Sequence, residues 1–139
     1  MSEPLVRIRL DDVSHVYYPG ETLSGEYWLQ SMTPDEVRAV EVSVLWHTEG
    51  KGDEDMAVHH FHRSPAEDDA AIDVRKPGRF STVLPKSPLS YRGMIVKVRW
   101  CVRVRAFLHR GGKEVFAQKV FRLGDIPPIK IPPQKSPNV

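Results

Sequence analysis

The longest run of alternating hydrophobic and polar positions lies between residues 96 and 108. Successive side chains of a β-strand point to opposite faces, so this alternation predicts a strand with one buried and one solvent-facing side, and it excludes a helix. Such a strand is well beyond the usual length of about five or six residues, so we expect it to bend or change sheets along its course. The side predicted to be buried consists of Val96, Val98, Trp100, Val102, Val104, Ala106 and Leu108, and the opposite side of Lys97, Arg99, Cys101, Arg103, Arg105 and Phe107.

Shorter alternating runs, separated by turn residues, predict further strands. They cover residues 5–10, 15–18, 23–30, 37–48, 56–62, 78–84 and 113–123, and residues 70–74 suggest a short edge strand. In the run 113–123 the apolar positions change parity, so a β-bulge near Gln118 is expected. No segment has a helical period. Seven to nine short strands of this kind predict an all-β protein built as a β-sandwich.

The length of 139 residues is that of one domain. We expect the sandwich over residues 1–124 and an extended tail over residues 125–139, which hold five prolines and no alternation. The single cysteine, Cys101, cannot form an internal disulfide, and the first residues lack the apolar run of a signal peptide. These features predict a cytoplasmic location. No apolar run is long enough for a bilayer, so no membrane span is expected.

The net charge of +2 conceals an uneven distribution along the chain. Residues 1–74 hold 5 Lys/Arg against 16 Asp/Glu, a net charge of −11, and residues 75–139 hold 15 against 2, a net charge of +13. Because the charges alternate with apolar residues, they are expected on strand faces rather than in tails. Either acidic strands neutralise basic ones across a sheet, or a cationic surface is left for an anionic partner.

Several short stretches occur together in one order along the chain. They are YPGE at 18–21, LSGEY at 23–27, the alternating run 37–46, the segment 80–85 that ends in proline, and SYRG at 90–93 before the long alternating run. In this order they resemble the arrestin-like superfamily, over about residues 5–123. The resemblance implies an immunoglobulin-like antiparallel sandwich, similar to single-domain bacterial relatives. It also implies a binding scaffold without catalytic residues or cofactors.

Two departures limit what the resemblance implies. Arrestins join two such sandwiches, whereas this chain has the length of one, so a clamp between two domains would require a dimer. The tail also lacks the Pro-Pro-x-Tyr motif by which some relatives recruit ubiquitin ligases, because Pro127-Pro128 and Pro132-Pro133 have no tyrosine after them. A role as an adaptor of that particular kind is therefore not expected.

A row of basic side chains on the long strand is the first candidate binding site. Guanidinium groups form paired hydrogen bonds with phosphate and carboxylate, so such a row suits an acidic or phosphorylated peptide. The cations repel one another only weakly in water, so the row does not require a ligand, and a solvated or internally paired face is the favoured alternative. The candidate residues are Lys97, Arg99, Arg103 and Arg105, with Arg7 and Arg9 from the first strand as an extension of the row.

Histidines offer a second, catalytic alternative. His60 and His62 share one face of a predicted strand, a spacing suited to zinc. His47 is a candidate neighbour across the hairpin, and His59 is expected to point the other way. No third ligand is evident, so no metal is assigned. Cys101 has cationic neighbours that could lower its pKa, but a lone thiol on a sheet face usually serves packing or lies at the surface, and no phosphate-binding glycine loop occurs. Nucleic-acid binding by the basic row is disfavoured, because Phe107 is the one aromatic residue on that face.

The sequence therefore predicts a non-enzymatic protein-interaction module of the adaptor or scaffold type. The partner is expected to be a protein, bound through a sheet edge or through the cationic strand face. An open sheet edge also allows a homodimer, because it accepts either a peptide strand or a second copy.

Overall fold

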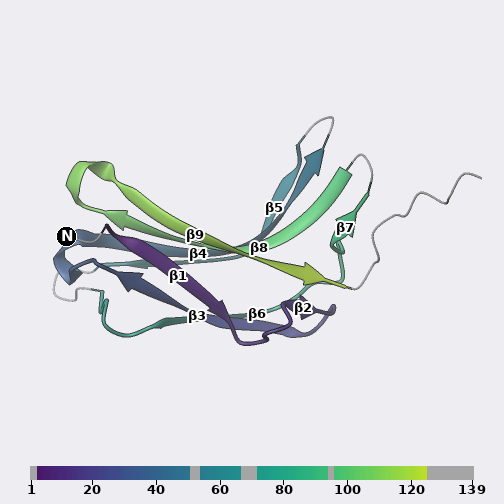
Figure 1. The fold of residues 1–139 in the computed structure, drawn as a ribbon, viewed down its shortest axis with the longest axis horizontal. Coiled ribbons are helices and arrows are strands. Elements are labelled where there is room, and N and C mark those ends of the chain that lie inside the picture. The colour runs from purple at the N-terminus through teal and green to yellow at the C-terminus, as the bar shows by residue number, and fades with distance from the viewer. Residues whose placement is uncertain (1–2, 51–53, 67–71, 94–95, 125–139) are drawn as a thin grey trace, which may run out of the picture.

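The structure is a computed structural model that describes residues 3–50, 54–66, 72–93 and 96–124. Within these ranges the chain forms two β-sheets packed face to face (Figure 1). The strands are β1 (Leu5–Leu10), β2 (Val16–Tyr17), β3 (Thr22–Gln30), β4 (Val37–Gly50), β5 (Met56–Pro65), β6 (Gly78–Val83), β7 (Tyr91–Arg92), β8 (Val96–Leu108) and β9 (Glu114–Leu123). The short 3₁₀ turns η1 (Pro34–Glu36) and η2 (Arg110–Gly112) connect β3 to β4 and β8 to β9. The proline-rich tail predicted from residue 125 lies outside the described residues.

The two sheets differ in size. The small sheet has the order β1-β3-β6, and the large sheet has the order β2-β9-β8-β4-β5, with β7 added at one end of β8. The pairs are antiparallel, except that β2 runs parallel to β9. The predicted all-β sandwich is confirmed.

The core lies between the sheets and is centred on β8. Trp100, Val102 and Val104 are fully buried, as the alternation predicted, and they share the core with residues of the small sheet such as Leu23 and Phe80. The indole N–H of Trp100 donates a hydrogen bond of 2.7 Å to the carbonyl of Pro88, so its one polar atom is satisfied inside the protein. A large buried aromatic ring with a paired N–H stabilises the core at little desolvation cost.

The strand β8 bends but stays in the large sheet. β4 flanks one side of it along its whole length, from Val96 opposite Gly50 to Leu108 opposite Val37. On the other side β9 pairs with residues 100–107, and the short strand β7 pairs with residues 97–98. The first residues of β8 rise away from the small sheet together with β5 (Figure 1), which leaves Val96 exposed.

The predicted exposure of Cys101 is wrong. The residue was expected on the solvent-facing side of β8, yet it is fully buried. It does lie on the outer side, in register with Leu45 of β4 and Val120 of β9, and these apolar neighbours cover it. Burial raises the pKa of its thiol, against the opposing effect of Arg103 and Arg99. The group is therefore a packing residue.

Two further predictions about strands are wrong. The pairing of β9 with β8 is continuous, with no bulge near Gln118. The parity changes because Phe116 and Val120 point outward and are 55% and 45% exposed. Residues 72–74 form a turn region rather than an edge strand, and residues 70–71 lie outside the described residues.

Candidate anion-binding cleft

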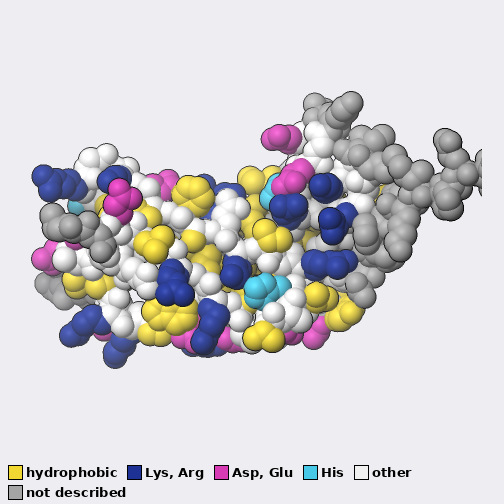
Figure 2. All heavy atoms as spheres, in the orientation of Figure 1, with side chains coloured by type: hydrophobic (Ala, Val, Ile, Leu, Met, Phe, Trp, Pro, Cys, Tyr) yellow, Lys and Arg dark blue, Asp and Glu magenta, His cyan; other side chains and the backbone are white. Residues whose placement is uncertain are grey.

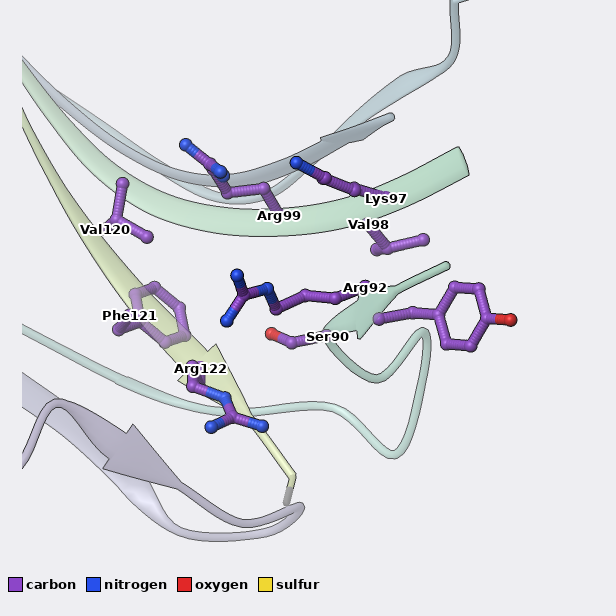
Figure 3. A pocket seen from close by; sticks show the side chains of 9 residues that line it. Ser90, Arg92, Lys97, Val98, Arg99, Val120, Phe121 and Arg122 are labelled. Carbon is purple, nitrogen blue, oxygen red and sulfur yellow. The ribbon is translucent and has the colours of Figure 1, made fainter. Parts of the chain in front are cut away.

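A cleft opens where β9 parts from β8 and β7 takes its place. Because β9 pairs with β8 only from Trp100 onward, and β7 pairs with Lys97 and Val98, the sheet divides at this point. The space between the two neighbours of β8 is a cleft of about 300 Å³. Its walls are formed by Ser90, Tyr91 and Arg92, by Lys97, Val98 and Arg99, and by Val120, Phe121 and Arg122 (Figure 3).

The wall that precedes β7 is fixed to the rest of the fold by short hydrogen bonds. The backbone N–H of Ser90 donates to the carbonyl of Leu123, and the Ser90 hydroxyl accepts from the Leu123 N–H, both at 2.8 Å. Two residues earlier, the Pro88 carbonyl holds the Trp100 indole. Since the floor includes the buried ring of Phe121, the cleft is a preformed feature of the sandwich.

Four cationic side chains from three strands line this one cleft. Arg92 comes from β7, Lys97 and Arg99 from β8, and Arg122 from β9 (Figure 3). Figure 2 shows Lys and Arg side chains gathered at the end of the molecule where β7 and the start of β8 lie. Such a cleft favours the binding of an anionic ligand, because its low-dielectric walls focus the electric field of the cations.

One carboxylate stands beside the cleft. Glu49 of β4 lies 3.6 Å from the guanidinium of Arg99 and 2.9 Å from the ring of His47. The hydrogen bond to His47, followed by the charges of Arg99 and other neighbours, lowers the pKa of Glu49. Arg92 and Lys97 have no ion pair with any described carboxylate. Positive charge is therefore in excess around the cleft.

The structure divides the predicted basic row into separate environments. Lys97 and Arg99 line the cleft, but Arg105 forms an ion pair of 3.1 Å with Glu114. Arg103 lines a neighbouring hollow of about 470 Å³ with His47 and acidic residues of the β4–β5 hairpin. The Nε atom of Arg103 is buried without a hydrogen-bond partner in the described part of the chain. Only half of the β8 row therefore contributes to the cleft.

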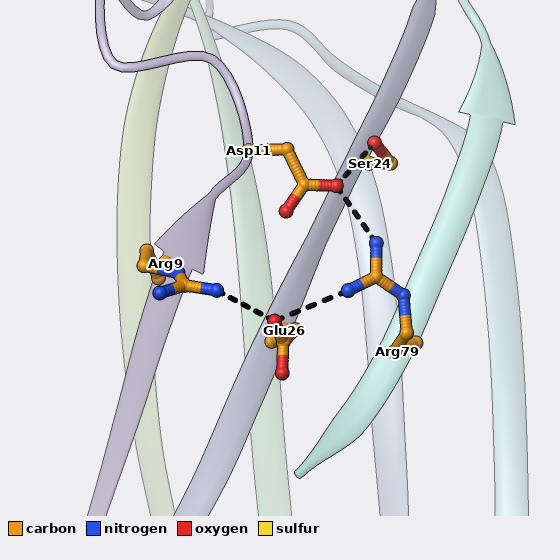
Figure 4. Close-up of polar contacts among 5 residues, drawn as sticks. All are labelled: Arg9, Asp11, Ser24, Glu26 and Arg79. Atoms are coloured by element: carbon orange, nitrogen blue, oxygen red, sulfur yellow. Dashed lines mark hydrogen bonds and ion pairs between the residues drawn. The ribbon is translucent and has the colours of Figure 1, made fainter.

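Arg7 and Arg9 do not extend the row, because β1 belongs to the other sheet. The guanidinium of Arg9 binds Glu26 at 2.6 Å, in a cluster with Asp11 and Arg79 (Figure 4). Arg9 also lies over the ring of Trp28, 5.5 Å from its centre. This cation–π contact explains why an aromatic residue occupies the polar side of β3.

The histidines are arranged differently from the prediction. His60 and His62 share the inner side of β5, opposite Val44 and Val42, as expected. A bulge turns His59 to the same side, where its Nε2 lies 2.8 Å from the Val83 carbonyl, whereas His47 faces outward opposite Met56. Burial, and then the neighbouring His59 and His62, lower the pKa of His60. Among the described residues, no three metal-ligating side chains are placed to share an ion.

Sequence analysis missed Arg92 and Arg122. Arg92 lies in a turn-rich stretch whose two-residue strand is too short for an alternation signal. Arg122 was not singled out, because the bulge expected near Gln118 would have shifted the residues beyond it to the opposite face. An unbroken alternation of 115, 117, 119, 121 and 123 would have placed it correctly.

Comparisons with known proteins identify the fold. No protein-family model matches the sequence, and a search of curated proteins finds no match either. Among solved structures, the chain is similar to Spo0M, the sporulation control protein of Bacillus subtilis, with a TM-score of 0.65 and 16% sequence identity. The fold is an arrestin-like β-sandwich. The match covers 91% of this chain but 51% of Spo0M, so the chain spans about half of that protein. Among the described residues, no helix is long and apolar enough to cross a membrane.

Proposed function

We propose that the protein is a cytoplasmic, non-enzymatic interaction module that binds an acidic or phosphorylated segment of a partner protein in the cationic cleft. The observation that carries this proposal is that Arg92, Lys97 and Arg99, together with Arg122, line one cleft. Two of these cations, Arg92 and Lys97, lack a described carboxylate partner.

The chemistry of the cleft suits an anionic group. Guanidinium groups present parallel N–H donors that match the oxygen atoms of phosphate or carboxylate, and the Lys97 ammonium adds a point charge. A cleft of about 300 Å³ accommodates one such group with its neighbouring atoms rather than a folded domain. The remainder of the bound segment would extend along the surface of the large sheet.

Isothermal titration calorimetry tests the proposal with three peptides of equal length that differ at one residue. That residue is phosphorylated in the first peptide, glutamate in the second and neutral in the third. We expect the phosphorylated and acidic peptides to bind with affinities that fall as salt is raised. The double variant Arg92→Glu/Lys97→Glu should weaken binding roughly tenfold or more, because it replaces two attractive charges by two repulsive ones.

The matched control is Arg110→Glu/Lys113→Glu. These residues are exposed beside the turn between β8 and β9, outside the cleft, and their reversal makes the same change in net charge. Binding should change by about twofold or less in this variant. Equal losses in both variants would mean that net charge alone attracts the peptides, and the proposal would be wrong. A random single-stranded oligonucleotide that bound more tightly than every peptide would instead favour nucleic acid as the partner.

A further inference from the structure

The edge strand β5 presents a long, unprotected pairing surface. It forms one edge of the large sheet, and no described strand pairs with the edge of β5 that faces away from β4. Eight of its ten residues are exposed, including Met56, Val58 and Phe61 at 50–60%. An edge of this length with free backbone groups is a template for another strand.

The pairing register shows which backbone groups are free. The N–H of Ala66 donates to the carbonyl of Arg38, so these two residues are a hydrogen-bonded pair. Hydrogen-bonded and non-hydrogen-bonded pairs alternate in antiparallel strands. The pairs Glu41 with Arg63 and Ser43 with Phe61 therefore leave the N–H and C=O groups of Phe61 and Arg63 on the open side of β5.

The other edges of the sandwich are shorter or partly covered. β2 has two residues, β1 lies against β9, and the carbonyl of Val83 at the end of β6 is contacted by the His59 ring. Natural edge strands avoid pairing by carrying exposed charges or internal prolines. β5 has one charged residue, Arg63, which is already paired with Glu41, and its one proline is the last residue.

We propose that β5 pairs antiparallel with β5 of a second copy, which extends the two large sheets into one continuous sheet across a two-fold axis. Apart from its histidines, the strand has no ionisable side chain except Arg63, which pairs with Glu41, so two copies meet without lysine, arginine or carboxylate repulsion. An acidic or phosphorylated segment finds no free cation on this edge.

Self-pairing also brings exposed apolar side chains together. The two-fold axis is perpendicular to the continuous sheet. The solvent-facing sides of the two large sheets therefore lie on the same side of that sheet. The Phe61 and Val58 side chains of each copy then lie beside those of the other, as cross-strand neighbours. Such a two-fold contact uses the same surface on both copies and closes after two.

Sedimentation velocity tests the inference with two matched variants. Phe61→Lys places a charge at the proposed contact, and Phe116→Lys places the same charge on the same outer face, on β9, at almost equal exposure. We expect a wild-type mass of twice 15.8 kDa in the micromolar range. Phe61→Lys should weaken dimerisation roughly tenfold or more, and Phe116→Lys should leave it unchanged.

Hydrogen exchange provides a readout of the backbone pairing itself. The amides of Phe61 and Arg63 should exchange more slowly as the protein concentration rises, because they become donors between the two copies. A monomer throughout the micromolar range would overturn the inference. Equal weakening by both lysine variants would overturn it as well, since association would then use the sheet face. Neither result bears on the cleft, which lies at β7, β8 and β9.

Discussion

Each of the two sheets carries one arginine-rich region, and the two regions differ in how far carboxylates pair with the arginines. On the small sheet, Arg9 and Arg79 bind Glu26 at 2.6 and 3.1 Å, and Arg79 also binds Asp11 at 2.7 Å (Figure 4). Asp11 in turn accepts a hydrogen bond from Ser24. Two cations thus meet two acids. On the large sheet, Arg92 and Lys97 line the cleft without an ion pair to any described carboxylate, and Arg99 beside them pairs with Glu49.

The difference shows which arginines are available to a ligand. In the small-sheet cluster, the carboxylates already occupy the guanidinium donors, so an incoming anion would have to displace them. In the cleft, an anion would relieve repulsion among the cations that line it. Under the proposed function, the carboxylates around an arginine would therefore indicate its role better than its spacing along a strand does.

The largest effect is expected from reversing Arg99, the cleft cation that pairs with Glu49. Arg99→Glu removes a donor from the cleft and places a second carboxylate beside Glu49. The affinity for a phosphorylated peptide should fall roughly tenfold to a hundredfold, measured by calorimetry. The free energy of unfolding should change by about 0.5 kcal/mol or less, because the pair is exposed. A large loss of stability without loss of peptide affinity would mean that Arg99 stabilises the fold and does not bind the ligand.

The next effect is expected in the small-sheet cluster. Glu26→Gln removes the charge shared by Arg9 and Arg79, and its side chain is 15% exposed. The free energy of unfolding should fall by about 1 kcal/mol, since each pair contributes modestly after solvent screening. Urea denaturation should show a lower midpoint at an unchanged slope. Peptide affinity should stay the same, and a matching loss of affinity would remove the distinction between the two regions.

A smaller change is expected at the carboxylate beside the cleft. Glu49→Gln releases Arg99 from its 3.6 Å pair and removes the negative charge that opposes an anionic ligand. Affinity for the phosphorylated peptide should rise by about twofold to threefold at low salt. The gain should disappear at high salt. An unchanged or lower affinity would show that Glu49 holds Arg99 in its binding position.

The smallest effect concerns pH. Hydrogen bonds from Ser24 and Arg79 hold the pKa of Asp11 below its usual value of about 3.8. Its stabilising contribution is therefore present above that usual value and is lost as the pH falls through the lowered pKa. In urea denaturation at a series of acidic pH values, Asp11→Asn should flatten the decline in stability below about pH 4. Arg92→Glu provides the comparison, since no described carboxylate pairs with Arg92, and profiles that differ equally from wild type would contradict the prediction.

The alternation of side chains was sufficient to predict most of the fold. It located β1, β3, β4 and β8 and placed Trp100 in the core, because a period of two is a local property of each strand. The fate of Cys101 was not local. Its burial on the outer side depends on Leu45 and Val120, which lie far away in the sequence.

The cleft was harder to predict for the same reason. Lys97 and Arg99 were found from their spacing, but their separation from Arg105 depends on Glu114 of the neighbouring strand. Arg92 joins them only because β7 replaces β9 beside β8. The pattern of apolar and polar residues along the chain does not indicate this change of neighbouring strand. Pairing across the sheet, rather than pattern along the chain, assembles the site.

The position of Trp100 gives the protein an intrinsic optical probe. Its ring lies 5.8 Å from Phe121, which lines the cleft, and its indole N–H is held by the segment that leads into the cleft wall. A fully buried indole emits at short wavelength, and its emission responds to small shifts of the groups around it. Occupation of the cleft should therefore be visible as a change in tryptophan fluorescence, without any dye attached to the protein or to its ligand.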